Sequence, residues 1–198
     1  MPVRGAACLA LLIAFAAAPA AAKGGAVTSS VGRCGAHEQP AAAGSAAAIP
    51  IPRLSGRVVD EAHILSPATR DALTRRSAAL ERRTRDQLVV VTLPDLKGRA
   101  IEAWGLALGN GWHIGQKGLN NGVLLVVAPN QRRVRIEVGC GLEGLLTDAR
   151  SAAIIRDPLL PLLKAKRYDA AAEAGVARIT AILERDTRRP QPHREPQR

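Results

Sequence analysis

Residues 122–138, which read GVLLVVAPNQRRVRIEV, decide the fold of this chain. The first seven are apolar without alternation, a pattern typical of a central strand that is covered on both faces. Pro129, Asn130 and Gln131 then supply turn chemistry. Residues 133–138 alternate between charged and apolar side chains, so we expect a second strand that pairs antiparallel with the first and has one solvent-exposed face. On that face Glu137 should be solvated or paired with an arginine.

Further strands and helices surround this hairpin. Residues 87–93 are β-branched and apolar, which predicts another buried strand, and residues 57–59 indicate a short one. Ser66 followed by Pro67 marks a helix start, because serine caps the first turn and proline needs no N–H donor there. The buried face of that helix is expected to combine Leu65, Thr69, Leu73, Arg76 and Leu80. Other helices are expected at residues 99–109, 147–157 and 169–185.

The fold class follows from the covered strands. A sheet whose central strands are apolar on both faces must lie between two layers of helices. The sequence therefore predicts an α/β fold, a three-layer α/β/α sandwich with a small mixed sheet of about four strands.

Six short motifs in two stretches of the chain carry a resemblance to a known family. Between Trp112 and Asp157 the sequence contains, in order, GQKG, NG, APN, RVRIEVG and GLEGLLTD, and residues 59–66 read VDEAHILS upstream. In this order the motifs resemble the TPM domain, which occurs in a thylakoid-lumen photosystem-repair protein, a nematode receptor-associated protein and many bacterial envelope proteins. The resemblance spans residues 58–183. It implies the same fold, Ca²⁺ binding and, from the plant relative, acid phosphatase activity on small phosphate esters.

The chain divides by composition into four segments. They are a signal peptide (residues 1–22), a flexible leader (23–49), the TPM domain (50–185) and a disordered basic tail (186–198). Arg4, an apolar run and the small residues up to Ala22 are typical of an exported precursor that is cleaved close to Ala20 or Ala22. We expect a secreted or periplasmic protein with no integral membrane segment after cleavage.

The formal net charge of +11 favours anionic partners such as phosphate groups or lipid head groups. A nucleic-acid surface also needs stacking aromatic side chains. The chain has only two Trp, one Tyr and one Phe. Nucleic acid is therefore not the expected partner, and an envelope protein is. The sequence indicates no particular oligomeric state.

The hairpin geometry gathers oxygen-bearing residues. Because antiparallel strands put the start of one beside the end of the other, Asn121 should lie near residues 139–143, with Asp148 close behind. Carboxylates, amide oxygens and backbone carbonyls are the ligands of a hard cation. We therefore predict a site for Ca²⁺, with Mg²⁺ or Mn²⁺ as alternatives. Its candidate ligands are Asp60, Asn121, Glu143 and Asp148, and Asp60 belongs only if the sheet topology brings it to this edge.

Three of the four candidate ligands also have a structural interpretation. Asp148 follows the N-cap residue Thr147, and a carboxylate in the first turn of a helix is stabilised by the helix dipole. Asn121 and Gly122 could form only a tight turn. Asp60 could cap a loop by local hydrogen bonding. The sequence leaves both interpretations open.

Two cysteines remain after the expected cleavage. Cys34 and Cys140 are a candidate disulfide pair in an oxidising compartment, with free thiols or an intermolecular bond as alternatives. The resemblance also implies that Cys140 stands where the family more often has Tyr, which argues against a catalytic thiol.

Motifs for other chemistry are missing from the sequence, including a serine nucleophile elbow, a His-Glu-x-x-His zinc motif and a phosphate-binding Walker loop. Catalytic residues are therefore not identified. We expect a cation-binding accessory module that acts on an envelope protein or assembly. The alternative is a weak metal-assisted acid phosphatase on small phosphomonoesters, with Glu143, Asp148 and Asp60 as ligands or base.

Overall fold

The computed structural model describes residues 48–185, so the predicted signal peptide, the tail and almost all of the leader lie outside the described residues. Four strands form one sheet in the order β1-β2-β3-β4. They are β1 (Val58–Asp60), β2 (Gln87–Thr92), β3 (Gly122–Ala128) and β4 (Arg133–Val138). The first three are parallel, and β4 is antiparallel to β3. The predicted mixed sheet is confirmed.

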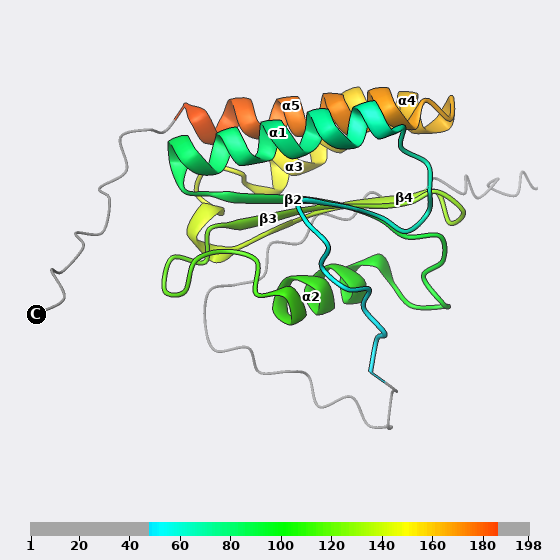
Figure 1. Ribbon diagram of the computed structural model, residues 1–198, viewed down its shortest axis with the longest axis horizontal. Helices are drawn as coiled ribbons and strands as arrows, with labels where there is room; N and C mark the ends of the chain where they lie inside the picture. The colour runs from blue at the N-terminus through cyan, green and yellow to red at the C-terminus, as the bar shows by residue number, and fades with distance from the viewer. Residues whose placement is uncertain (1–47, 186–198) are drawn as a thin grey trace, which may run out of the picture.

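Helices cover both faces of this sheet (Figure 1). One layer contains α1 (Pro67–Thr84), α3 (Asp148–Ile154), the π-helical turn η2 (Ile155–Leu159), α4 (Leu160–Lys164) and α5 (Tyr168–Glu184). The other face carries α2 (Ile101–Trp112), and the short 3₁₀ turn η1 (Cys140–Leu142) follows β4. The three-layer sandwich expected from the sequence is confirmed.

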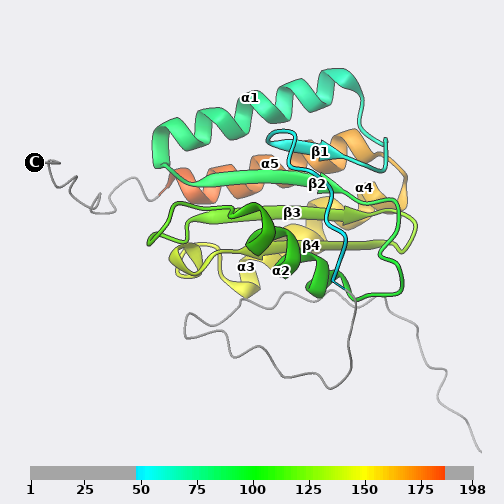
Figure 2. The same cartoon turned by 60° about the horizontal axis from the view of Figure 1, so that its bottom comes forward.

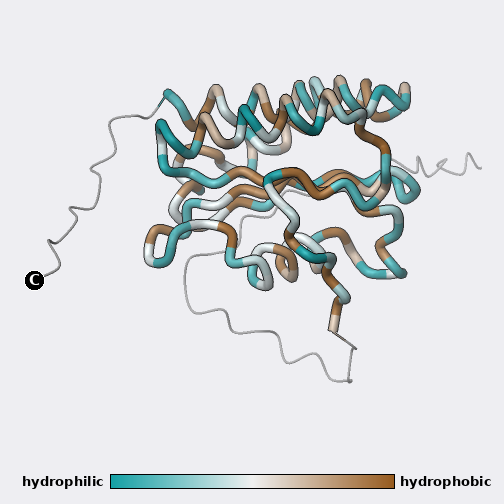
Figure 3. Tube along the Cα trace, in the orientation of Figure 1, coloured by the Kyte–Doolittle hydropathy of each residue, from teal (hydrophilic) through white to brown (hydrophobic). Residues whose placement is uncertain are grey.

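The two central strands divide their side chains between two cores. Val90 of β2 and Leu125 of β3 belong to the core beneath α1 and α5. Their neighbours Val91 and Val126 belong to the core beneath α2. Successive side chains of a strand point to opposite faces, so the continuous apolar run of each strand fills both cores, and Figure 3 shows the hydrophobic colour concentrated along these strands.

The two β-α-β connections have opposite hands. Strands β1, β2 and β3 are parallel and lie side by side in chain order, yet α1 and α2 cover opposite faces (Figures 1 and 2). Right-handed connections alone would place both helices on the same face. One connection is therefore left-handed, a rare arrangement that nevertheless lets two helices shield both sides of the parallel strands.

The start of α1 follows the prediction, but its buried face differs at one position. The Ser66 hydroxyl accepts a hydrogen bond from Thr69 N at 3.2 Å, and Pro67 occupies the first turn. Arg76 is exposed, whereas Ser77 is buried together with Leu73 and Leu80. The expected burial of Arg76 was wrong because the small Ser77 faces the sheet in its place.

Strand β4 differs more strongly from its prediction. Its expected solvent-exposed face is covered by α2, so that the side chain of Arg135 is 4% exposed and that of Glu137 is 14% exposed. Arg135 Nε donates to Glu137 Oε2 at 2.6 Å. A Cβ at Gly105 of α2 would lie only 2.7 Å from Glu137 Oε2, so glycine permits the helix to approach. The expected pairing of Glu137 is confirmed, and its expected solvation was wrong.

The helix predicted to break at Pro158 continues instead as a π-helical turn. Pro158 lies within η2, between α3 and α4. Proline lacks an N–H donor, and the wider π turn accommodates that missing bond without ending the helical path. Within residues 48–185 no helix is both long and apolar enough to cross a bilayer.

The N-terminal part of the described chain packs against α2. Ile49 and Ile51 are partly buried against the core beneath this helix. Trp112 Nε1 donates to Pro52 O at 2.9 Å. Ordered packing thus includes Ile49, which composition alone assigns to the leader.

Candidate functional site

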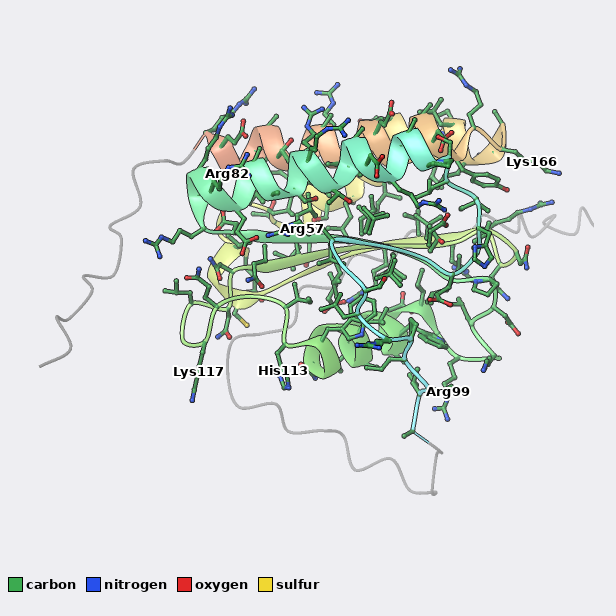
Figure 4. The ribbon with its side chains drawn as sticks, viewed as in Figure 1. Arg57, Arg82, Arg99, His113, Lys117 and Lys166 are labelled. Carbon is green, nitrogen blue, oxygen red and sulfur yellow. The ribbon has the colours of Figure 1, made fainter. Side chains whose placement is uncertain are left out.

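The hairpin ends meet where the sequence predicts. Gly139 N donates to Gly122 O at 2.7 Å, and Gly141 N donates to Asn120 O at 3.1 Å. Residues before β3 and after β4 therefore form one loop edge, which we call the hairpin edge and define as residues 115–122 and 139–148. Figure 4 shows Lys117 at this edge with its side chain directed away from the sheet.

Asn121 is the central buried residue of the hairpin edge, with 4% of its surface exposed. Its Oδ1 accepts a hydrogen bond from Gln116 N at 2.8 Å. Its Nδ2 donates to Arg85 O at 2.8 Å and to Asp86 Oδ1 at 3.3 Å. Both ends of the amide are thus hydrogen-bonded, so Asn121 joins the loop before β3 to the connection between α1 and β2.

Two residues that the sequence does not single out complete this clamp. Asp86, which is buried, accepts a hydrogen bond from the Asn121 amide. Gln87 joins the loop at Gly115 to helix α1 at Glu81. Gln87 Oε1 accepts from Gly115 N at 2.8 Å, while its Nε2 donates to Glu81 Oε1 at 3.1 Å. Both residues lie at the start of β2, which runs parallel to β3. Parallel strands begin at the same end of a sheet, but the sequence predicted a strand here without its direction.

Glu143 and Asp148 are the ionisable pair of the hairpin edge. Glu143 Oε1 is buried and has no hydrogen-bond partner among the described residues. Its burial, and secondly the negative charge of Asp148, raise the pKa of the Glu143 carboxyl above its usual range. Asp148 is exposed in the first turn of α3, behind the Thr147 cap. The pair therefore concentrates negative charge at a place where one oxygen lacks a donor.

Asp60 does not join this pair. It ends β1 and pairs in register with Thr92 at the end of β2, whereas Asn121 precedes β3 at the opposite edge. Its Oδ1 accepts from Thr92 Oγ1 at 2.5 Å and from Ile64 N at 3.2 Å, and its Oδ2 accepts from Leu65 N at 3.1 Å. The parallel topology separates Asp60 from the other candidates, and these contacts match its loop-capping interpretation.

Fewer of the predicted ligands lie together than a divalent cation site usually uses. Within residues 48–185 no three His, Cys, Asp or Glu side chains are grouped to hold a metal. Glu143 and Asp148 supply two carboxylates, and Ca²⁺ accepts backbone carbonyls and water as its remaining ligands. Of the four predicted ligands, Glu143 and Asp148 lie close enough to interact at the hairpin edge, and Asp60 lies at the other end of the strands.

Cys140 lies at the start of η1 and is disulfide-bonded. No other cysteine occurs in residues 48–185, so its pairing with Cys34 stays a prediction. Non-reducing peptide mapping of protein isolated from an oxidising compartment should give a Cys34–Cys140 peptide that separates on reduction. Recovery of Cys34 as an alkylated thiol, or of a peptide joining Cys140 to Cys8, would contradict that pairing.

The TPM domain family model matches residues 58–182 of this chain. The chain belongs to the TPM domain family. This match covers every described strand and helix except the end of α5. No curated protein matches the chain.

Solved structures share the TPM fold of this chain. The N-terminal domain of a protein from P. gingivalis, solved by NMR, is 34% identical with a TM-score of 0.66, and the match covers 72% of this chain and 94% of that one. The N-terminal domain of the cg2496 protein from Corynebacterium glutamicum is 18% identical, with a TM-score of 0.52 and coverage of 67% and 84%. The BA42 protein from Bizionia argentinensis is 16% identical, with a TM-score of 0.53 and coverage of 61% and 82%. The last two show a shared fold alone.

Proposed function

We propose that this TPM domain is an exported accessory module that binds a divalent cation, Ca²⁺ in the first instance, through Glu143 and Asp148. The observation that carries the proposal is the buried Glu143 Oε1, to which no residue between 48 and 185 donates a hydrogen bond, beside a second carboxylate. Two nearby carboxylates repel each other when both are ionised, and a bound cation relieves that repulsion. Mg²⁺ and Mn²⁺ use the same class of ligand and are tested alongside.

The accessory role rests on how the other reactive side chains are placed. His63 and His113 both adopt left-handed backbone conformations, with φ of 52° each, and His113 terminates α2. Such positions suit turn and cap residues. Neither histidine has a described hydrogen bond to Glu143, so we assign neither of them a role as catalytic base. A cation at the hairpin edge would order the loop surface on which an envelope protein could dock.

The test is a calcium-dependent thermal shift. Ca²⁺ at one hundred times its dissociation constant should stabilise the folded domain by about 2.7 kcal/mol. Glu143→Gln and Asp148→Asn each remove one charged ligand while preserving shape, so either should abolish most of this shift. Asp71→Asn, at an exposed carboxylate on α1, is the matched control and should leave the shift unchanged.

The same variants distinguish the other interpretations. If Asp148 only complements the helix dipole, Asp148→Asn should cost roughly 0.3–1 kcal/mol with or without calcium. Hydrolysis of a generic phosphomonoester, measured in parallel, tests the phosphatase alternative, and metal-dependent turnover that is lost in Glu143→Gln would establish it. A calcium shift without turnover supports the accessory module. The absence of any shift with Ca²⁺, Mg²⁺ or Mn²⁺ would remove the cation site.

A further inference from the structure

A cleft of about 570 Å³ lies between α5 and the continuous helical segment α3–η2. Leu145 of the hairpin edge belongs to its lining, whereas Glu143 and Asp148 do not. Cavities of roughly 300–1,000 Å³ are the size that accommodates small molecules. The cleft is formed where two small side chains face it, Ala153 from α3 and Ala181 from α5. Because alanine ends at Cβ, the two helices leave space between them.

The lining of the cleft is a stripe along one face of α5. Arg178, Ala181, Ile182 and Arg185 follow the spacing i, i+3, i+4 and i+7, which places them on the same side of a helix. The two apolar residues lie between the two arginines. At a rise of 1.5 Å per residue the arginines are separated by about 10 Å along the helix. Ile154 of the facing segment extends the apolar floor.

The charge of the cleft is positive. Three arginines line it, against Asp157 as the one lining carboxylate. Asp157 is already paired with Arg156, whose Nε and Nη2 donate to its two oxygens at 2.7 and 3.1 Å. These hydrogen bonds lower the pKa of Asp157, so it stays ionised and paired near neutral pH. Arg178 and Arg185 are both exposed, and Arg178 lies close enough to Asp157 that its positive charge also lowers the pKa of that carboxyl.

We propose that this cleft binds a small anionic amphiphile, a single molecule with a phosphate or carboxylate group and an apolar portion. The planar guanidinium groups of Arg178 and Arg185 match the oxygens of such an anion. The apolar portion would lie on Ala181 and Ile182. The recessed shape between two helices favours a single molecule over a bilayer surface.

The chain's own C-terminal residues have the wrong charge to fill the cleft. They carry four arginines, at positions 188, 189, 194 and 198, against Asp186 and Glu195. Like charges repel, so this segment does not complement Arg178 and Arg185. The charge complementarity points to a separate anionic ligand.

The test measures binding of octyl phosphate, below its micellar concentration, to the full chain by titration calorimetry. Saturable one-to-one binding is expected, with inorganic phosphate and octyl glucoside at least tenfold weaker because each lacks one half of the ligand. The double variant Arg178→Ala with Arg185→Ala should weaken octyl phosphate binding at least tenfold. The matched control, Arg75→Ala with Arg76→Ala on exposed positions of α1, removes the same charge and should stay within twofold.

A steric variant tests the apolar half independently of charge. Ala181 is exposed, so Ala181→Trp should leave the folded domain intact, as checked by its Tm, while filling the cleft and weakening binding at least tenfold. Equal losses in both arginine double variants would overturn the proposal, as would unchanged binding in Ala181→Trp. A protein that binds only vesicles of anionic phosphatidylglycerol, and loses that binding in the variant Arg75→Ala with Arg76→Ala, would also overturn the proposal. Its exposed arginines would then serve to dock on a bilayer. The calcium shift of the hairpin edge should be unaffected in every cleft variant, so the two proposals can fail separately.

Discussion

Gly122→Ala should destabilise the domain by about 3 kcal/mol, at the upper end of the usual cost of overpacking. A Cβ at this position would lie 2.3 Å from Ile114 O, 2.6 Å from Ile114 C and 2.9 Å from Gly115 N. All three are backbone atoms, so no side-chain rotation relieves the clash. Gly122 is also buried within β3 and paired with Gln87 of β2. Equilibrium urea unfolding of the variant measures the loss directly.

The matched control is Gly109→Ala in α2. There the added Cβ would lie 3.6 Å from Leu124 Cδ1, an ordinary van der Waals distance. Alanine is favoured over glycine inside a helix by roughly 0.5–1 kcal/mol, so this variant should be neutral or more stable. Equal stability of the Gly122 and Gly109 variants would show that the loop at residues 114–115 can move away from β3.

Asn121→Asp should cost about 3 kcal/mol at neutral pH, because it both removes donors and buries a charge. The new carboxylate could no longer donate to Arg85 O, and it would lie beside the Asp86 carboxylate. Below the raised pKa of the new, buried carboxyl the neutral acid regains one O–H donor. The stability difference from the parent chain should therefore narrow as the pH falls, which chemical denaturation at several pH values would reveal.

Asn130→Asp makes the same chemical change at an exposed amide. Asn130 Nδ2 donates to Pro94 O at 2.7 Å in the loop after β3. Exposed substitutions of this kind usually stay within about 0.5 kcal/mol. If Asn130→Asp lowered the free energy of unfolding as much as Asn121→Asp does, the burial of Asn121 would not be the reason for its cost.

The strands and helices were predictable because each carries a local signal. Two continuous apolar runs became β2 and β3, and Ser66 with Pro67 placed the start of α1. The burial of β4 beneath α2 was not predictable. An alternating pattern shows which side chains share a face of the strand, but not that Gly105 of a distant helix allows that helix to approach Arg135. The opposite hands of the two connections likewise depend on how whole elements pack and leave no local sequence pattern.

The candidate site was predictable only as far as strand pairing determines it. The antiparallel hairpin required Asn121 to lie near the end of β4, and the structure places it there. The position of Asp60 depended on whether β1 runs parallel to its neighbour, which its three residues do not reveal. The buried oxygen of Glu143 and the amide contacts of Asn121 arise from tertiary packing, which residue type alone does not report.

The ion pair beneath α2 also bears on self-association. β4 forms one edge of the sheet, and among the described residues no further strand hydrogen-bonds to its outer side. An open strand edge can recruit the same strand of another copy and so begin aggregation. Inward-pointing charges on an edge strand are one of the devices by which proteins discourage such pairing, and Arg135 and Glu137 are charges of this kind. The opposite edge is only three residues long. An apolar pair at positions 135 and 137 would keep the contact with α2 while exposing the sheet to strand-by-strand growth.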